Sequence, residues 1–140
     1  MHIQSLSLRH FRTYKRLELV ELPPKPVLLL GANAQGKTSI LEAIAYLALG
    51  SSPLTHRDHH LIHWDAIDAA MPFAHLEAEI VRKSGPEAIE IALEWRTLSN
   101  GNRRTQKTIK INQRSVRLSD LAGHLNVVCF LPEDLTLVTG

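Results

Sequence analysis

One eight-residue motif constrains the fold of this chain more than any other feature. Residues 31–38 read Gly-Ala-Asn-Ala-Gln-Gly-Lys-Thr, with the spacing G-x-x-x-x-G-K-[ST] of a phosphate-binding loop. An apolar run at 27–30 precedes the motif, and apolar residues recur at helical spacing from Ser39 to Leu49. Because such a loop joins a strand to the first turn of a helix, the sequence predicts a strand–loop–helix unit in an α/β fold.

The residue types in this loop suit a nucleoside triphosphate. Glycines at 31 and 36 permit a tight turn and let backbone N–H groups approach phosphate oxygens closely. The helix N-terminus adds partial positive charge at the same point. Lys37 is predicted to reach the β- and γ-phosphates, and the Thr38 hydroxyl to bind Mg²⁺. The predicted nucleotide-binding residues are Gly31, Ala32, Asn33, Ala34, Gln35, Gly36, Lys37, Thr38 and Ser39.

The composition is that of an ordinary globular chain. Of 140 residues, 44% are hydrophobic and 21% are charged, which fits about one domain. The single cysteine, Cys129, lies in an apolar run and cannot form an internal disulfide, so a reducing cytoplasm is expected. No stretch of ~20 apolar residues and no signal peptide are present, so we expect neither a membrane span nor export.

The rest of the chain reads mainly as strands. Residues 3–8 alternate as a first strand, and an extended stretch runs on to Leu22. Residues 74–81 and 89–95 alternate as a hairpin, and 108–112 predicts a third antiparallel strand. We therefore predict three parts: strands, phosphate loop and first helix (1–66), an antiparallel β-subdomain (74–117), and a helix at 118–125 with a buried strand at 126–131 and an acidic loop (118–140).

Four motifs, in order along nearly the whole chain, resemble the RecF family of bacterial recombination ATPases, which are related to SMC heads. They are L-x-L-x-x-F-R-x-Y at 6–14, G-x-N-x-x-G-K-T-x-x-L-E-A-I at 31–44, R-D-x-x-L-I at 57–62 and F-x-P-E-D-L-x-L-V-x-G at 130–140. The chain departs from the family at Ala34, where glycine is usual; alanine stiffens the loop without removing a backbone donor.

The resemblance implies the N-terminal lobe of a P-loop NTPase head of the ABC/SMC type, with an attached antiparallel β-subdomain. It further implies ATP with Mg²⁺, ATP-driven homodimerisation, and binding to double-stranded DNA and gap junctions during recombinational repair. The implied protein partners are RecR, RecO and RecA. Arg12 would contact the phosphates, or else be a surface arginine; Glu133 and Asp134 would sense Mg²⁺ and the γ-phosphate, or else form a turn with a helix N-cap.

Some parts of such an ATPase have no match in this sequence. A Walker B segment and a dimer-forming signature motif are expected, but the nearest candidate, 127–134, is interrupted by proline. We therefore expect the chain to be the N-terminal portion of a larger protein, with no catalytic residue of its own and little ATPase activity alone. The alternatives are the head of another SMC-like protein, such as an overcoming-lysogenization-type nuclease, and a module that holds nucleotide without hydrolysing it.

Two further clusters have both a functional and a structural interpretation. Histidines recur at spacings of three and four from 56 to 63, which suits either a metal site or four exposed histidines on a linker helix. We favour the second, because Arg57 is interleaved and no cysteine is near. Leu61, Ile62 and Trp64 in this stretch are predicted to be core contacts rather than a base-stacking platform.

The segment from Arg96 to Arg117 contains seven basic residues and no acidic one. Positions 110, 112 and 114 are predicted to share one face of a strand, opposite the isoleucines at 109 and 111. Such a patch either contacts DNA phosphates without reading bases or is a solvated hairpin face. The candidate DNA contacts are Arg103, Arg104, Lys107, Lys110, Arg114 and Arg117.

Overall fold

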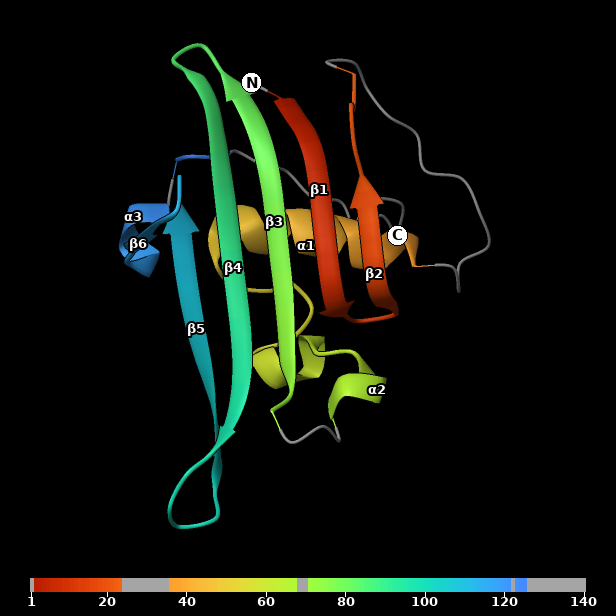
Figure 1. The fold of residues 1–140 in the computed structure, drawn as a ribbon, viewed down its shortest axis with the longest axis vertical. Helices are drawn as coiled ribbons and strands as arrows, with labels where there is room; N and C mark the ends of the chain where they lie inside the picture. Colours follow the sequence, from red (N-terminus) through yellow and green to blue (C-terminus); the bar gives the residue numbers. More distant parts are fainter. Residues whose placement is uncertain (1, 24–35, 68–70, 122, 126–140) are drawn as a thin grey trace, which may run out of the picture.

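A computed structural model describes residues 2–23, 36–67, 71–121 and 123–125, and its framework is one antiparallel sheet. Six strands lie in the order β2-β1-β3-β4-β5-β6 (Figure 1). They are β1 (His2–Phe11), β2 (Tyr14–Leu19), β3 (Phe73–Arg82), β4 (Gly85–Thr97), β5 (Arg103–Ile111) and β6 (Arg114–Val116). The helices are α1 (Lys37–Leu49), the 3-10 helix η2 (Asp58–Leu61), α2 (Trp64–Ile67) and α3 (Leu118–Leu121).

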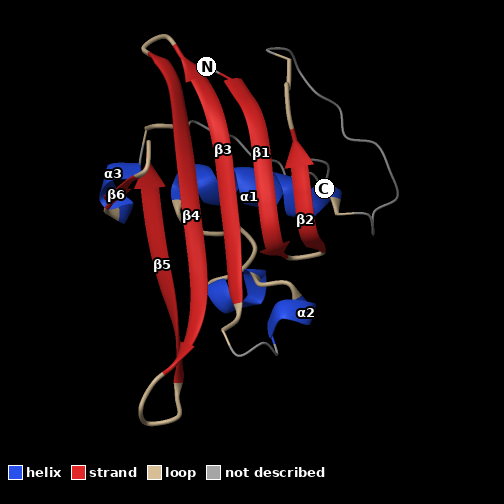
Figure 2. Ribbon diagram, viewed as in Figure 1, coloured by secondary structure: helices blue, strands red, loops and turns tan. Residues whose placement is uncertain are grey.

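The sheet has one apolar and one polar face, because side chains alternate along each strand. In β3, Leu76 and Ile80 are buried while Glu79 between them is exposed. The long helix α1 crosses one side of the sheet (Figure 2), and buried apolar side chains of the strands pack with those of α1 in one core cluster. The described part of the chain is thus two layers, helix on sheet.

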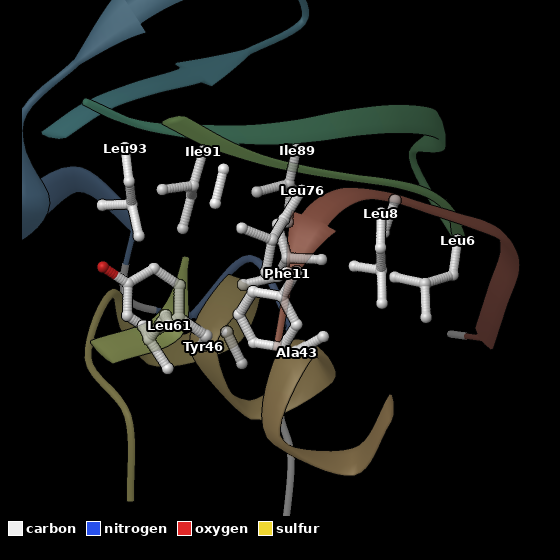
Figure 3. Packing of buried hydrophobic residues seen from close by; sticks show 14 of the residues in the cluster. Leu6, Leu8, Phe11, Ala43, Tyr46, Leu61, Leu76, Ile89, Ile91 and Leu93 are labelled. Carbon is white, nitrogen blue, oxygen red and sulfur yellow. The ribbon is translucent and has the colours of Figure 1, made fainter. Parts of the chain in front are cut away.

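The core lies between α1 and the central strands. Ala43 and Tyr46 of the helix point toward Leu76, Ile89 and the other strand residues (Figure 3). These four named residues are 0% exposed. Burying a large apolar side chain contributes roughly 1.5–3 kcal/mol, so this layer is the main source of stability in the described residues.

Left-handed glycines bound the long helix at both ends. Gly36 precedes α1 with φ 85°, and Gly50 follows it with φ 71°. The Gly50 N–H donates to the Tyr46 carbonyl at 2.7 Å, which closes the last turn. The predicted helix over 39–49 is therefore observed, and it begins two residues earlier than predicted, at Lys37.

We expect Gly50→Ala to destabilise the protein by more than backbone strain alone. A Cβ at Gly50 would lie 2.1 Å from Leu118 Cδ1, so the Leu118 side chain on α3 would have to move. Left-handed φ costs alanine about 1–2 kcal/mol, and the collision adds about 1 kcal/mol. Gly101→Ala is the matched control, because its φ is 86° but nothing lies within 4 Å of the new Cβ. Urea unfolding would give equal losses for the two variants if the contact with α3 were unimportant.

The sheet is more continuous than the sequence patterns predicted. The predicted β-subdomain and the first strands share it, because β1 lies between β2 and β3. β5 begins at Arg103, five residues before the predicted start, and α3 ends at Leu121 rather than 125. The predicted strands at 27–30 and 126–131 lie outside the described residues, and the division into 1–66, 74–117 and 118–140 stays a prediction.

One face assignment was wrong. Arg114 does not continue the strand that contains Lys110, because the chain reverses at Asn112 and Gln113, whose φ values are 52° and 67°. Arg114 instead begins β6 and pairs with Ile111. Within the described ranges, no helix is long and apolar enough to cross a membrane.

Candidate nucleotide-binding site

The described part of the predicted site is the start of α1. Residues 31–35 of the loop lie outside the described residues, as do Glu133 and Asp134. Gly36 is buried, and the helix begins with Lys37. Thr38 is exposed and Ser39 is 8% exposed. The structure thus describes the point where the loop ends and α1 begins.

The turn between β1 and β2 packs directly on this helix start. A Cβ at Gly36 would lie 2.6 Å from Tyr14 Oη and 2.9 Å from Thr13 Oγ1. The Tyr14 hydroxyl donates to the Gly36 carbonyl at 3.2 Å. Only glycine fits at this position, because both the φ of 85° and the close approach exclude a side chain.

A charged network links the same turn to the side of α1. Arg12 Nε and Nη2 donate to the two carboxylate oxygens of Glu42, at 2.7 and 2.8 Å. The Ser52 hydroxyl donates to Glu42 Oε2 at 2.6 Å. The Glu42 side chain is 2% exposed and that of Arg12 is 29% exposed. This is a bidentate ion pair with a buried carboxylate, a geometry that fixes both partners.

Sequence reasoning had missed Glu42 and Ser52. One signal was available: Glu42 is the only acidic residue in the otherwise apolar run of α1. A lone carboxylate on a buried helix needs a cationic partner. In this structure that partner is Arg12, so the phosphate contact expected of Arg12 stays a prediction.

The histidine stretch differs from the expected linker helix. It contains only the short 3-10 helix η2, and His63 is buried at 4% exposure. The His63 N–H donates to the His10 carbonyl at 2.6 Å, which holds the residue inside. Among the described residues, no group of three or more His, Cys, Asp or Glu is arranged to hold a metal ion.

The three apolar residues of this stretch, Leu61, Ile62 and Trp64, differ in how exposed their side chains are. Leu61 and Ile62 are 0% and 4% exposed, so the prediction that they are core contacts is confirmed. The same prediction is wrong for Trp64, which is 72% exposed because it starts the short surface helix α2.

The basic segment is split between the two faces of the sheet. Lys107 lies on the helix side: its Nζ is 3.1 Å from Asp58 Oδ2, donates to the Gly50 carbonyl at 2.5 Å, and lies 5.0 Å from the Tyr46 ring centroid. Burial raises the pKa of the Tyr46 hydroxyl, and the nearby Asp58 carboxylate raises it further. Lys107 is therefore a structural cation at the end of α1, where the helix dipole favours positive charge.

The other basic residues are more open to solvent. Arg104 is exposed and directly opposite Arg96 across the β4–β5 ladder. Arg103 lies over the Trp95 ring, with Cζ 4.4 Å from the centroid. Lys110 is opposite Glu90. Arg114, the first residue of β6, and Arg117, which follows β6, are both exposed.

A hollow of about 490 Å³ opens at the end of the β4–β5 hairpin. Its lining residues are Arg96, Leu98, Arg104, Thr105, Gln106 and Lys107. Two guanidinium groups opposite one another repel, and Glu94 Oε2 pairs with Arg96 alone at 2.7 Å. The hairpin end is thus a cationic surface with room for an anion.

The fold and the helix start define a class of protein. A family model described as an AAA domain matches residues 5–136, so the chain belongs to that family. The SMC head domain from Thermotoga maritima has the same fold: its TM-score is 0.58 at 20% identity, over 86% of this chain and 41% of that chain. The predicted fold class, the N-terminal lobe of a P-loop NTPase head, is confirmed.

The particular resemblance is to RecF. The DNA replication and repair protein RecF of Chloroflexus aurantiacus is 44% identical over 144 residues, and that of Halalkalibacterium halodurans is 42% identical over 140. Both comparisons include 100% of this chain, which spans about a third of the relatives' own length (36% and 34%). The predicted resemblance to the RecF family is confirmed.

Proposed function

We propose that this chain binds ATP with Mg²⁺ at residues 31–39 as the nucleotide-binding lobe of a RecF-type DNA replication and repair ATPase. The observation that carries the proposal is the 44% identity to a RecF protein along the whole chain, phosphate-loop motif included. That similarity favours this role over the nuclease-head alternative.

The start of α1 fits the proposed ligands. A Cβ at Gly36 would collide with Tyr14 and Thr13, so glycine is what lets the chain turn from the loop into the helix there. Thr38 is exposed in the first turn, and hydroxyl oxygen is a ligand that Mg²⁺ accepts. Mg²⁺ bound there would neutralise charge on the phosphates. Glu42 uses two of the five N–H donors of Arg12, which leaves others able to reach an anion.

The wider role follows from the resemblance. ATP would join two heads into a homodimer, and slow hydrolysis would separate them. The dimer would bind double-stranded DNA at gap junctions in the cytoplasm and act with RecR, RecO and RecA. The role of the RecF relatives in DNA replication and repair supports this assignment.

Two binding measurements on the full-length protein test this function. Calorimetry with ATP and Mg²⁺ should detect binding, and fluorescence anisotropy should detect tighter binding to gapped duplex DNA when ATP is present. A protein that binds no ATP would overturn the nucleotide assignment. ATP binding without any DNA affinity would overturn the repair role alone.

We assign the DNA contact to the open end of the β4–β5 hairpin. Arg96 and Arg104 repel each other there, and a phosphate between them would relieve the repulsion. Lys107 is excluded from this surface because Asp58 and the Gly50 carbonyl hold it. The contact would be to the DNA backbone and would not read sequence.

Replacing both Arg96 and Arg104 by alanine is expected to weaken DNA binding equally for different sequences. Each lost phosphate contact lowers the slope of log affinity against log salt by about one, so the double variant should lose about two. Anisotropy titrations between low and moderate salt give this slope. Arg16→Ala is the control, because Arg16 is an exposed arginine on β2 paired with Glu18. An unchanged slope in the double variant would move the DNA contact elsewhere.

A further inference from the structure

The face of the sheet opposite α1 carries a small hollow at the start of β3. The hollow has a volume of about 200 Å³, and Figure 2 shows α1 on the other side of the strands. Arg9 of β1 lies directly opposite His75 of β3, which lies opposite Ala92 of β4. Phe73 and Glu94 form the next pair on this face. The hollow exists because Ala92 leaves space among these four larger side chains.

Arg9 is the charged group of this hollow that has no partner among the described residues. The Glu94 carboxylate is compensated, because its Oε2 lies 2.7 Å from Arg96 Nη2. His75 Nε2 donates to Glu90 Oε1 at 2.5 Å, so the imidazole is also occupied. The hollow therefore presents one exposed, unpaired guanidinium group, which suits an anion.

A second guanidinium group lies beside Arg9. Arg16 is directly opposite Arg9 across the β1–β2 ladder, and its Nη2 lies 2.7 Å from Glu18 Oε1. Like charges at directly opposed positions destabilise a ladder. A carboxylate bound at Arg9 would compensate its charge and remove part of that cost.

The other wall of the hollow is apolar and continues onto the surface. Phe73 is 38% exposed, and its ring meets that of His10 edge-on at 4.6 Å. Met71 is 63% exposed and Trp64 is 72% exposed, and Figure 1 shows α2, which starts at Trp64, beside the lower ends of β1 and β3. Large apolar side chains exposed together mark interaction sites, and tryptophan is enriched among the residues that dominate binding.

We propose that this surface binds an extended segment of another protein in which phenylalanine or leucine lies next to aspartate or glutamate. The apolar side chain enters the hollow against Phe73, and the carboxylate pairs with Arg9. A hollow of about 200 Å³ is smaller than the ~300–1,000 Å³ of pockets for small molecules, so it suits a single side chain. The proposal goes beyond the proposed function, because it depends on neither nucleotide nor DNA.

The charges of this face favour a protein segment over DNA. Glu77 lies directly opposite Glu90 on the same face and has no ion-pair partner among the described residues. A DNA backbone would bring a row of phosphates past these carboxylates, whereas one acidic side chain needs only the contact with Arg9. Binding to DNA rests on several phosphate contacts, and this hollow offers one free cation.

Selection from a phage-displayed random peptide library on the full-length protein tests the proposal. We expect the enriched peptides to share phenylalanine or leucine beside an acidic residue. Fluorescence anisotropy with one enriched peptide, made synthetically, gives its affinity. Arg9→Ala and Phe73→Ala should each weaken binding at least about fivefold, as expected of residues central to an interface. Arg9→Glu should reject this peptide and select basic peptides instead, because it reverses the charge of the hollow.

Lys83→Ala is the matched control for Arg9→Ala, because Lys83 is exposed in the turn at the opposite end of β3 and carries the same charge. It should keep wild-type peptide affinity. The proposal is wrong if no peptide is enriched, if the enriched peptides lack the acidic residue, or if Arg9→Ala binds them as Lys83→Ala does. A lower salt slope for duplex DNA in Arg9→Ala would assign Arg9 to the DNA contact and also overturn it. Because Arg9 is exposed, its variants keep the test decisive if Phe73→Ala unfolds early.

Discussion

Arg12→Ala is expected to lower the free energy of unfolding by about 3 kcal/mol, the lower end of the range for breaking a buried ion pair. The variant leaves the Glu42 carboxylate inside the protein with the Ser52 hydroxyl as its remaining hydrogen-bond donor of the network. We choose the lower end because the Arg12 side chain is 29% exposed and water can partly replace it. Urea unfolding measures the loss as a lower midpoint at unchanged slope.

Two further variants identify the cause of that loss. Arg12→Ala combined with Glu42→Gln should recover at least half of it, because a neutral amide is easier to bury than an unpaired carboxylate. Arg16→Ala removes an exposed arginine from an ion pair whose side chains are 64% and 51% exposed, and should change stability by less than about 1 kcal/mol. If Arg12→Ala resembled Arg16→Ala, the pair with Glu42 would contribute no more than a surface pair.

Local patterns predicted the elements of the fold well. Alternation of apolar and polar residues located β3 and β4, and helical periodicity located α1 between Gly36 and Gly50. Each of these patterns needs only neighbouring residues, because one sheet face or one helix stripe is buried.

Such local patterns do not predict which strands pair with one another in the sheet. Nothing in the alternation of β1 indicates that it lies between β2 and β3, because strand order depends on which partners close the sheet. The reversal at Asn112 and Gln113 was missed because the predicted strand ran through it, although asparagine tolerates left-handed φ.

The side-chain contacts of the candidate site also could not be predicted from local sequence patterns. Arg12 and Glu42 are 30 residues apart in sequence, and only the fold brings them together. Lys107 belongs to a basic run, so the sequence alone could not separate it from Arg104. Its contacts with Asp58 and the end of α1 make the distinction.

Lys37→Ala is expected to reduce ATP affinity by at least about 100-fold in the full-length protein. Losing a charged group that pairs with a phosphate in a desolvated site costs about 2–5 kcal/mol, and each 1.4 kcal/mol is tenfold in affinity. The fold should be unaffected, because Lys37 occupies the first position of α1 and alanine is a good helix former. Calorimetry with ATP and Mg²⁺ gives the affinity, and thermal unfolding without nucleotide checks the fold.

Lys15→Ala separates this effect from the general loss of a positive charge. Lys15 is 70% exposed on β2 and pairs with Asp65 at 3.0 Å, so its removal changes net charge by the same amount as Lys37→Ala. ATP affinity should stay within about twofold of wild type in that variant, because Lys15 is exposed to solvent and its charge is paired with Asp65. Unchanged ATP affinity in Lys37→Ala would mean that residues 31–38 do not hold the triphosphate. Equal losses in both variants would attribute the effect to net charge, so only a selective loss in Lys37→Ala supports the phosphate loop.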